Sequence, residues 1–311
     1  MTGARRIELG ERLQSLWGGY GELWRAELAG TGATTSSIVK VVQPPAGDSG
    51  ASQRRKLRSY EVERHFYESY AARCLEPTGC RIPRPLALEH ADGGWLFVLE
   101  DLDAAGFGER RGRASPSEIS ATLRWLASFH ARFLGVAPDG LWKTGTYWQL
   151  GTRAEELVQM RHPALRQAAA RIDARLGAAR FKTFVHGDAK LENVCFAAAG
   201  DEVALVDFQY VGGGVGVKDV AYFLNGVLPS RECEALVPVY LDEYFRELRG
   251  AVAQLQPRSE ATELEREWRE LFPFAWADFY RFLLGWAPGQ FDDDTYSERV
   301  ARRVLGALTS G

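Results

Sequence analysis

The chain has 311 residues, of which 46% are hydrophobic and 25% are charged, a balance that is typical of folded globular proteins and argues against a disordered one. The length exceeds that of one ordinary domain and favours two domains or lobes. Lysine and arginine total 38 against 41 aspartate and glutamate, so the net charge of −3 argues against a nucleic-acid-binding surface and against a polybasic membrane anchor.

The cysteines and the apolar segments indicate the compartment. The four cysteines show no C-x-x-C spacing, so we expect buried thiols in a reducing environment; they are Cys74, Cys80, Cys195 and Cys233. The N-terminal residues lack the apolar stretch of a signal peptide. The longest apolar stretch, 271–287, is interrupted by Asp278 and Arg281 and is expected to be a buried or amphipathic helix that does not span a membrane. We therefore expect a cytoplasmic protein.

The first hundred residues favour a small lobe rich in strands. Short runs bounded by glycine or proline predict strands at 22–28, 37–42, 86–89 and 95–99, the last two joined as a hairpin. The small and polar stretch 46–52 predicts a loop. A helix is predicted over 57–74, where the apolar residues Val62, Phe66, Tyr70 and Cys74 recur every four residues. We expect four or five strands and one helix in this lobe.

From Ser115 onward the pattern becomes helical. Ser115, Pro116 and Glu118 form a capping box with proline in the first helical turn. Further helices are predicted over 153–177, 231–250 and 262–287, the last kinked or broken at Pro273. A strand-rich stretch, 181–208, lies between them. The whole pattern predicts an α+β protein with two lobes that meet directly after the last N-terminal strand.

The segment 184–193 carries the strongest chemical signal. Phosphoryl transfer from ATP needs a group that holds the acceptor hydroxyl in line and accepts its proton, and metal ions that neutralise the phosphate charge. From a single loop, Asp188 can hold the acceptor hydroxyl and accept its proton, and Asn193 can supply one metal ligand. Asp207, at the end of a short apolar strand, supplies a second oxygen ligand of the kind that Mg²⁺ prefers. The alternative is an ordinary polar turn followed by a strand-end cap.

These motifs resemble those of the protein-kinase-like superfamily. His186-Gly187-Asp188 is similar to the catalytic-loop His-Arg-Asp, Asn193 matches the metal-binding asparagine, and Asp207-Phe208 is similar to the start of Asp-Phe-Gly. Gly187 in place of arginine and Gln209 in place of glycine depart from protein kinases. Both changes point to the small-molecule branch of aminoglycoside phosphotransferases, choline kinases and ecdysteroid-kinase-like proteins. The stretches 206–214 and 218–223 most resemble the last of these.

The resemblance implies a bilobal kinase-like fold that binds ATP and Mg²⁺ between an N-lobe (1–100) and a C-lobe (104–311), joined by a hinge (101–103). Asp188 would be the catalytic base, and Lys190 would contact the transferred phosphate. The backbone of Glu100 and Leu102, at the hinge, would hydrogen-bond adenine. The alternative for the hinge is an acidic linker without a ligand.

The resemblance also implies an N-lobe lysine for the α- and β-phosphates and a helix carboxylate that orients it. Lys40 lies mid-strand among apolar residues, where an unpaired charge is costly. A surface lysine on an edge strand is the alternative. Glu61 and Glu63 compete as its partner, and Glu63 is preferred because it borders the buried stripe of its helix.

A loop over the phosphates is expected between the first two strands. Gly18, Gly19 and Gly21 occupy that place, but they lack the G-x-G-x-x-G spacing, so a plain glycine-rich hairpin competes with a backbone contact to ATP. Two further polar residues favour structural roles. His130 falls on the apolar face of its helix and is expected in the core, and Asp219 either caps a helix or, by resemblance, supports the catalytic loop.

The sequence therefore predicts ATP-dependent phosphorylation of a hydroxyl on a small molecule, such as a sugar, an alcohol, a steroid-like compound or an antibiotic. A protein kinase is one alternative, although no Ala-Pro-Glu element precedes the helix at Asp219. A nucleotide-binding regulator without catalysis is another, although every expected catalytic position is filled. The aromatic residues near the C-terminus are expected mostly in the core, and those in the cleft would favour a ring-bearing acceptor. The acidic run 292–294 either attracts a cationic acceptor or starts a helix.

Overall fold

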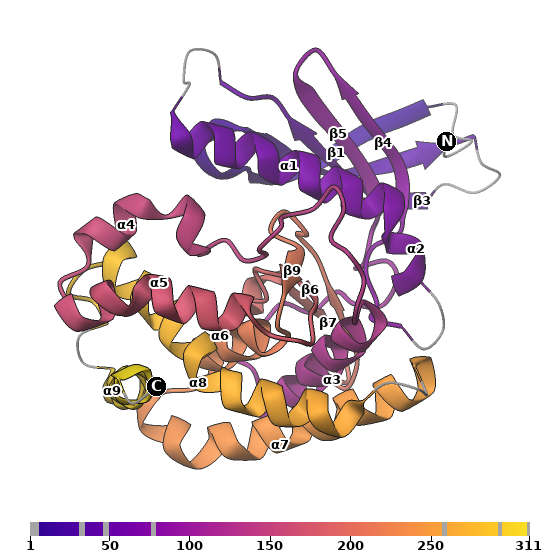
Figure 1. Cartoon of the computed structure of the whole chain (residues 1–311). Helices are drawn as coiled ribbons and strands as arrows, with labels where there is room; N and C mark the ends of the chain where they lie inside the picture. The colour runs from indigo at the N-terminus through magenta and orange to yellow at the C-terminus, as the bar shows by residue number, and fades with distance from the viewer. Residues whose placement is uncertain are drawn as a thin grey trace.

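The computed structural model describes residues 6–30, 35–45, 50–75, 79–256, 260–291 and 294–309. Five antiparallel strands form one sheet above the helical part of the molecule in Figure 1. In chain order they are β1 (Arg6–Ser15), β2 (Gly21–Ala29), β3 (Thr35–Val42), β4 (Pro85–Ala91) and β5 (Gly94–Glu100). Their spatial order is β1-β2-β3-β5-β4, so β3 is the central strand. Lys40 thus lies in the middle of the sheet, which excludes the edge-strand alternative.

One long helix accompanies the sheet. α1 (Ala51–Ser69) crosses in front of the strands in Figure 1 and is followed by the short α2 (Ala71–Cys74). The prediction of a loop to residue 52 and a helix from 57 was wrong at this boundary, because Ala51 and Ser52 are already helical; residues 46–49 lie outside the described ranges. Small and polar side chains at the start of α1 carry no apolar periodicity that could have revealed this turn.

The second part of the chain is mainly helical. It begins with α3 (Pro116–Arg132), whose capping box at Ser115 and Glu118 forms as predicted. The later helices are α4 (Ala154–Gln159), α5 (Pro163–Gly177), α6 (Val217–Val227), α7 (Ser230–Leu255), α8 (Ala261–Trp286) and α9 (Thr295–Thr309). Between α5 and α6 the chain forms two short antiparallel strand pairs. They are β6 (Thr183–Val185) with β9 (Gly212–Gly214), and β7 (Val194–Phe196) with β8 (Val203–Leu205).

Two predicted helices differ from the observed ones. The stretch 153–177 forms α4 and α5, because the proline that opens α5 suits a first helical turn but cannot continue an incoming helix. The stretch 262–287 forms one helix, α8, which continues through Pro273, so of the two predicted outcomes, a kink or a break, the break was wrong. Phe272 and Trp276 beside this proline are buried. Their packing outweighs the loss of one helical hydrogen bond.

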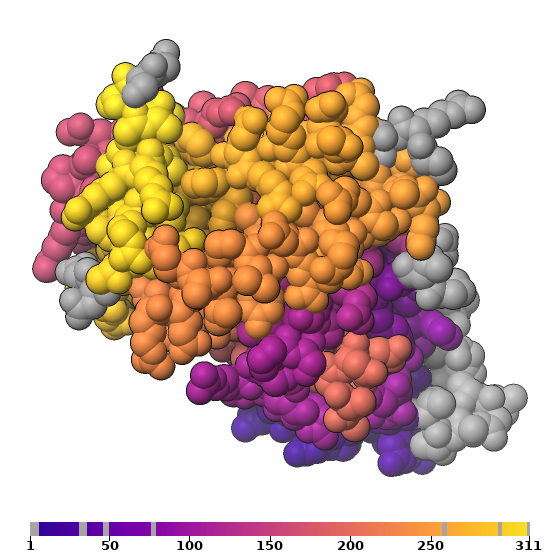
Figure 2. Space-filling view, turned by 90° about the horizontal axis from the view of Figure 1, so that it is seen from below, coloured from indigo at the N-terminus to yellow at the C-terminus, as the bar shows by residue number. Residues whose placement is uncertain are grey.

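The three C-terminal helices cover the lower face of the molecule, where Figure 2 shows α7 and α8 in orange beside α9 in yellow. Most aromatic residues of α8 are buried, as predicted, but Trp286 is 60% exposed. All four cysteines are buried, as predicted, and none of them forms a disulfide among the described residues. Asp294 accepts a hydrogen bond from the Ser297 amide at the start of α9, whereas Asp292 and Asp293 lie outside the described residues.

Within the described ranges, none of the helices combines the length and apolar character needed to cross a bilayer.

A buried cluster of charges ties α6 to α8. Asp278 accepts a hydrogen bond from Arg281 (2.7 Å), and its second oxygen lies 3.2 Å from Lys218 Nζ. Burial by itself would raise the pKa of Asp278, but Arg281 and Lys218 lower that pKa below its ordinary value. The carboxylate is therefore ionised in the folded protein at neutral pH.

We expect Asp278→Ala to lower the free energy of unfolding by about 3–5 kcal/mol, because two cations would remain buried without a counter-charge. A depressed pKa in the folded state stabilises the protein at neutral pH, and this contribution is lost as the pH falls through that pKa. The variant and the wild type should therefore converge in acid. Urea unfolding at several pH values measures the difference, with the exposed Asp242→Ala as control. A loss no larger than that of the control at neutral pH would contradict the assignment.

Candidate active site

A cleft of about 470 Å³ lies between the sheet and the helical part of the chain. Most of the residues that the sequence analysis singled out for the site line it, and they come from both parts of the protein: Lys40, Glu63, Glu100, Leu102, Lys190, Asn193 and Asp207. Asp188 lies beside the cleft, in contact with Lys190 and Asn193. Gly18, Gly19 and Gly21 are not among the lining residues.

Asp188 lies in the loop that follows β6 and is almost fully buried. The Tyr222 hydroxyl donates a hydrogen bond to its Oδ1 (3.0 Å), Asn193 Nδ2 donates to its Oδ2 (3.0 Å), and Lys190 Nζ is 3.3 Å from Oδ2. Burial raises the pKa of Asp188 to about 6, although Lys190 acts to lower it. A carboxylate that is oriented at both oxygens, with a pKa nearer to neutrality, is suited to accept a proton from a hydroxyl group.

The backbone of this loop is held by Asp219. The amides of His186 and Gly187 donate to its two carboxylate oxygens, at 2.6 and 2.9 Å, and His130 Nε2 lies 3.1 Å from Oδ2. Asp219 therefore contacts the loop and does not cap α6. His130 is fully buried in the core, as predicted. These contacts fix the conformation of the backbone immediately before Asp188.

The backbone conformation of the same loop requires a glycine at position 187. Its φ is +81°, and a Cβ at this position would lie 2.2 Å from the carbonyl oxygen of Tyr210. Residues other than glycine rarely adopt this backbone conformation. The segment after Asp207 thus passes too close to the loop for a side chain at position 187, which is where protein kinases carry arginine.

Asp207 follows β8 with a φ of +69°, a strained conformation of the kind that clusters at functional sites. Its Oδ1 is buried, has no hydrogen-bond partner in the described part of the chain, and lies 3.8 Å from Lys40 Nζ. Burial would raise the pKa of Asp207, but the lysines of the cleft, Lys40 first, lower it below its ordinary value. Asn193 uses its Nδ2 to contact Asp188, which leaves its Oδ1 available to the cleft.

These oxygen atoms fit a Mg²⁺ ion. Proteins usually bind Mg²⁺ through one or two carboxylates, together with substrate phosphates and water. An ionised Asp207 with an unpartnered oxygen, beside the amide oxygen of Asn193, provides such a donor set. Among the residues that the structure describes, no group of three or more His, Cys, Asp and Glu could hold a metal ion unaided. A cation here would need phosphate oxygens or water to complete its coordination.

Lys40, on β3 of the sheet, forms a buried ion pair with Glu63, on α1. The two charged atoms are 2.6 Å apart, and each side chain is at most 8% exposed. Burial acts to lower the pKa of Lys40, but Glu63 and Asp207 raise it above its ordinary value. Glu61 lies on the outer face of α1, where it pairs with Arg58. The helix is therefore oriented as its apolar stripe predicts.

The glycines before β2 form a tight turn. Gly18 and Gly19 have φ near +75°, and at Gly21 a Cβ would lie 2.0 Å from the Val41 carbonyl oxygen. Leu16 and Trp17, on the near side of this turn, line the cleft in place of the glycines. The turn geometry alone accounts for these three glycines.

The segment after β5 presents its backbone to the cleft. The Glu100 side chain is held by Arg81 (2.7 Å) and by the Arg84 amide (3.0 Å). Asp101 is anchored to the sheet through Arg25 (3.0 Å). The Leu102 carbonyl accepts from the Phe107 amide, whereas the Leu102 amide donates to no atom of the described residues. This donor is thus available to a ligand in the cleft.

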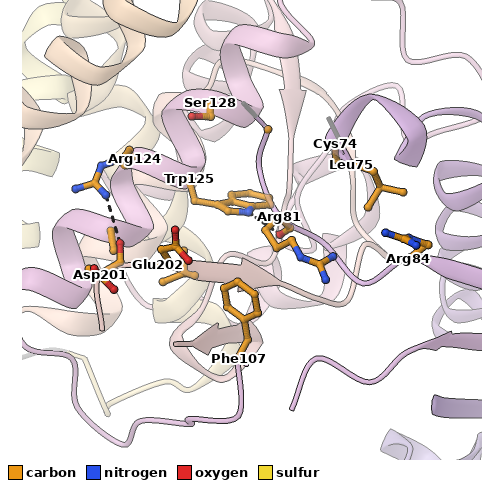
Figure 3. A pocket seen from close by; sticks show the side chains of 13 residues that line it. Cys74, Leu75, Arg81, Arg84, Phe107, Arg124, Trp125, Ser128, Asp201 and Glu202 are labelled. Carbon is orange, nitrogen blue, oxygen red and sulfur yellow. Dashed lines mark hydrogen bonds between the residues drawn. The ribbon is translucent and has the colours of Figure 1, made fainter. Parts of the chain in front are cut away.

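A second hollow of about 440 Å³ lies beside this segment, between α2, α3 and the β7–β8 pair. Figure 3 shows Arg81 and Trp125 near its centre, with Arg124 hydrogen-bonded to the Asp201 carbonyl at one side. None of the catalytic, metal-binding or cofactor-binding residues predicted from the sequence lines it. Its lining residues Arg81, Arg84 and Phe107 contact Glu100 and Leu102, which line the cleft.

Two residues beside the site were missed by the sequence analysis. Tyr222, on α6, contacts Asp188, and no local pattern marks it, because the contact joins residues 34 positions apart. Lys56 lines the cleft seven residues before Glu63, which places both on one face of α1. This spacing could have indicated Lys56, but the predicted helix began one residue too late to include it.

A family model supports the class of protein that the fold and the site indicate. The model of the phosphotransferase enzyme family matches residues 38–258, which is more than half of the chain, so the chain belongs to this family. No match was found among curated proteins.

Solved structures agree with this fold. An ethanolamine kinase from Plasmodium vivax has a TM-score of 0.51 at 11% identity, covering 96% of this chain and 82% of that one. A choline kinase from Cryptosporidium parvum has a TM-score of 0.51 at 11% identity, covering 98% and 89%. The predicted bilobal kinase-like fold and its small-molecule branch are confirmed. The closer resemblance to ecdysteroid-kinase-like proteins stays a prediction.

We expect Gly187→Ala to destabilise the protein and to displace Asp188, because its Cβ would meet the Tyr210 carbonyl. Gly135→Ala is the matched control, since Gly135 has a similar φ of +75° but no atom within 4 Å of its Cβ position. Backbone strain alone costs about 1–3 kcal/mol, which both variants share. Thermal unfolding of the two variants separates the clash from the strain. Equal losses in both would show that the loop accommodates a side chain at 187.

Proposed function

We propose that the protein transfers the terminal phosphoryl group of ATP to a hydroxyl of a small molecule, with Mg²⁺ as cofactor. One observation carries the proposal: the Lys40–Glu63 pair lines the same cleft as Asn193 and Asp207, with Asp188 in contact with Asn193. Membership of a phosphotransferase family supports the reaction type.

Asp188 orients the acceptor hydroxyl and accepts its proton. As the acceptor oxygen bonds to the γ-phosphorus, the bond to the departing ADP oxygen breaks, and the proton passes to the Asp188 carboxylate. Its raised pKa makes Asp188 a better proton acceptor than an ordinary aspartate. Lys190 is 41% exposed beside it and can follow the transferred phosphate.

Asp207 and Asn193 would hold Mg²⁺, which neutralises charge on the phosphates. Lys40, which its ion pair with Glu63 orients, would contact the α- and β-phosphates. The free amide of Leu102 and the carbonyl of Glu100 would bind the adenine edge. The turn of Gly18, Gly19 and Gly21 would contribute to the nucleotide site by holding Leu16 and Trp17 against the cleft.

The acceptor side of Asp188 is aromatic. Tyr222 contacts the carboxylate, and the Tyr147 ring meets the rings of Tyr222 (5.7 Å between centroids) and Phe282 (5.2 Å) edge-on. Such surfaces favour an acceptor with an apolar or ring-bearing body. Asp294, the member of the acidic run that the structure describes, accepts hydrogen bonds from Ser230 and Ser297 at the start of α9.

The two aspartates should fail differently when changed to asparagine. Asp188→Asn should keep ATP·Mg²⁺ affinity nearly unchanged while turnover falls by about 10²–10⁴-fold. Asp207→Asn should lose both turnover and the gain in nucleotide affinity that Mg²⁺ provides. Calorimetry with and without Mg²⁺, and a coupled ADP assay over a panel of alcohols and sugars, measure both. A folded Asp188→Asn protein with wild-type turnover would rule out the mechanism.

The ion pair in the sheet gives a second test. Lys40→Ala and Glu63→Ala should both raise the KM for ATP or lower kcat by about 10-fold or more, because each removes the charged contact that positions the phosphates. Glu61→Ala, on the outer face of the same helix, should leave both constants unchanged. Steady-state kinetics on the three variants decides the point. Damage from Glu61→Ala together with a silent Glu63→Ala would contradict it.

A further inference from the structure

Three lysines face Asp207 in the cleft, and they differ in how their charge is balanced. Lys40 is paired with Glu63 at 2.6 Å, and Lys190 with Asp188 at 3.3 Å. Lys56 has no carboxylate within 4.0 Å among the residues that the structure describes. Of these three lysines, Lys56 is therefore the one whose positive charge no nearby described carboxylate neutralises.

Lys56 is nevertheless held in place. Its Nζ donates to Gln209 Oε1 (3.2 Å) and lies 5.1 Å from the centre of the Tyr60 ring. Ser59 donates to the same Gln209 oxygen (3.0 Å), and Gln209 itself is 4% exposed. A buried amide that is fixed by a second donor orients the ammonium without neutralising it. Since an ammonium has three hydrogens to donate, two remain for a ligand.

The surroundings indicate an anionic ligand. A partly buried charge without a counter-ion is costly, and a phosphate oxygen would remove that cost. Burial lowers the pKa of Lys56, while Asp207 and, more weakly, Asp188 raise it. The ammonium thus lies within electrostatic reach of both aspartates between which a transferred phosphoryl group would pass.

We propose that Lys56 binds the terminal phosphate of the bound nucleotide and that Gln209 is the residue that positions it. This inference rests on the proposed function. It gives a physical role to Gln209, which stands where protein kinases carry glycine: a glycine has no side chain to hold Lys56 over the phosphates.

The test compares two nucleotides that differ in the terminal phosphate. Binding of the non-hydrolysable ATP analogue AMP-PNP and of ADP, both with Mg²⁺, is measured by calorimetry on Lys56→Gln, Lys56→Arg and the wild type. Lys56→Gln should weaken AMP-PNP by about 10-fold or more and ADP by about 3-fold or less, because only the analogue carries the terminal phosphate. Lys56→Arg should retain most of the affinity. Lys143→Gln, an exposed lysine outside the cleft, is the control.

A second variant separates binding from folding. Gln209→Asn shortens the amide by one methylene, and it should reproduce the selective loss of AMP-PNP affinity while Lys56 keeps its charge. Unchanged affinities in Lys56→Gln, or equal losses for both nucleotides, would overturn the role of Lys56 at the terminal phosphate. A wild-type protein that binds neither nucleotide would instead overturn the proposed function, and this inference with it.

Discussion

The carboxylate of Asp219 is the constraint on which the arrangement of the site depends. It is fully buried, and it receives the amides of two successive residues, His186 and Gly187, together with a contact from His130. The other ring nitrogen of His130 lies 2.8 Å from the Tyr244 hydroxyl. A buried charge is tolerated because donors surround it. The network runs through α3, α6 and α7, so Asp188 is placed by the helical core and not by the loop alone.

The segment that begins with Asp207 is coupled to α1 at three successive residues. Asp207 lies 3.8 Å from Lys40, which is itself held by Glu63 of α1. Phe208 stacks on Phe66 of α1 with ring centroids 4.2 Å apart. Gln209 accepts hydrogen bonds from Lys56 (3.2 Å) and Ser59 (3.0 Å) of α1. A shift of α1 would therefore disturb an ion pair, an aromatic stack and an amide contact together.

The charges of the cleft are only partly compensated within the protein. Two ion pairs, Lys40 with Glu63 and Lys190 with Asp188, neutralise most of them. Among the residues that the structure describes, one buried oxygen of Asp207 has no hydrogen-bond partner, and the ammonium of Lys56 contacts a neutral amide and an aromatic ring but no carboxylate within 4.0 Å. These two unsatisfied groups have opposite signs. They suit the proposed binding of a nucleotide with Mg²⁺, which presents a cation and an anion side by side.

Short-range signals by themselves determined much of this protein. The capping box at Ser115, the strand around Lys40 and the Asp188–Asn193 loop each follow from residues within a few positions, and helical periodicity alone distinguished Glu63 from Glu61. These features depend on backbone geometry that neighbouring residues impose, so the sequence displays them directly.

Only the tertiary structure decided the features that join distant parts of the chain. Lys56 meets Gln209 across 153 positions of sequence, and the carbonyl of Tyr210 is what restricts position 187 to glycine. α8 stays unbroken at Pro273 because the buried side chains around it pack against other helices. No local pattern encodes such contacts, because their free energy comes from surfaces that meet only after the chain has folded.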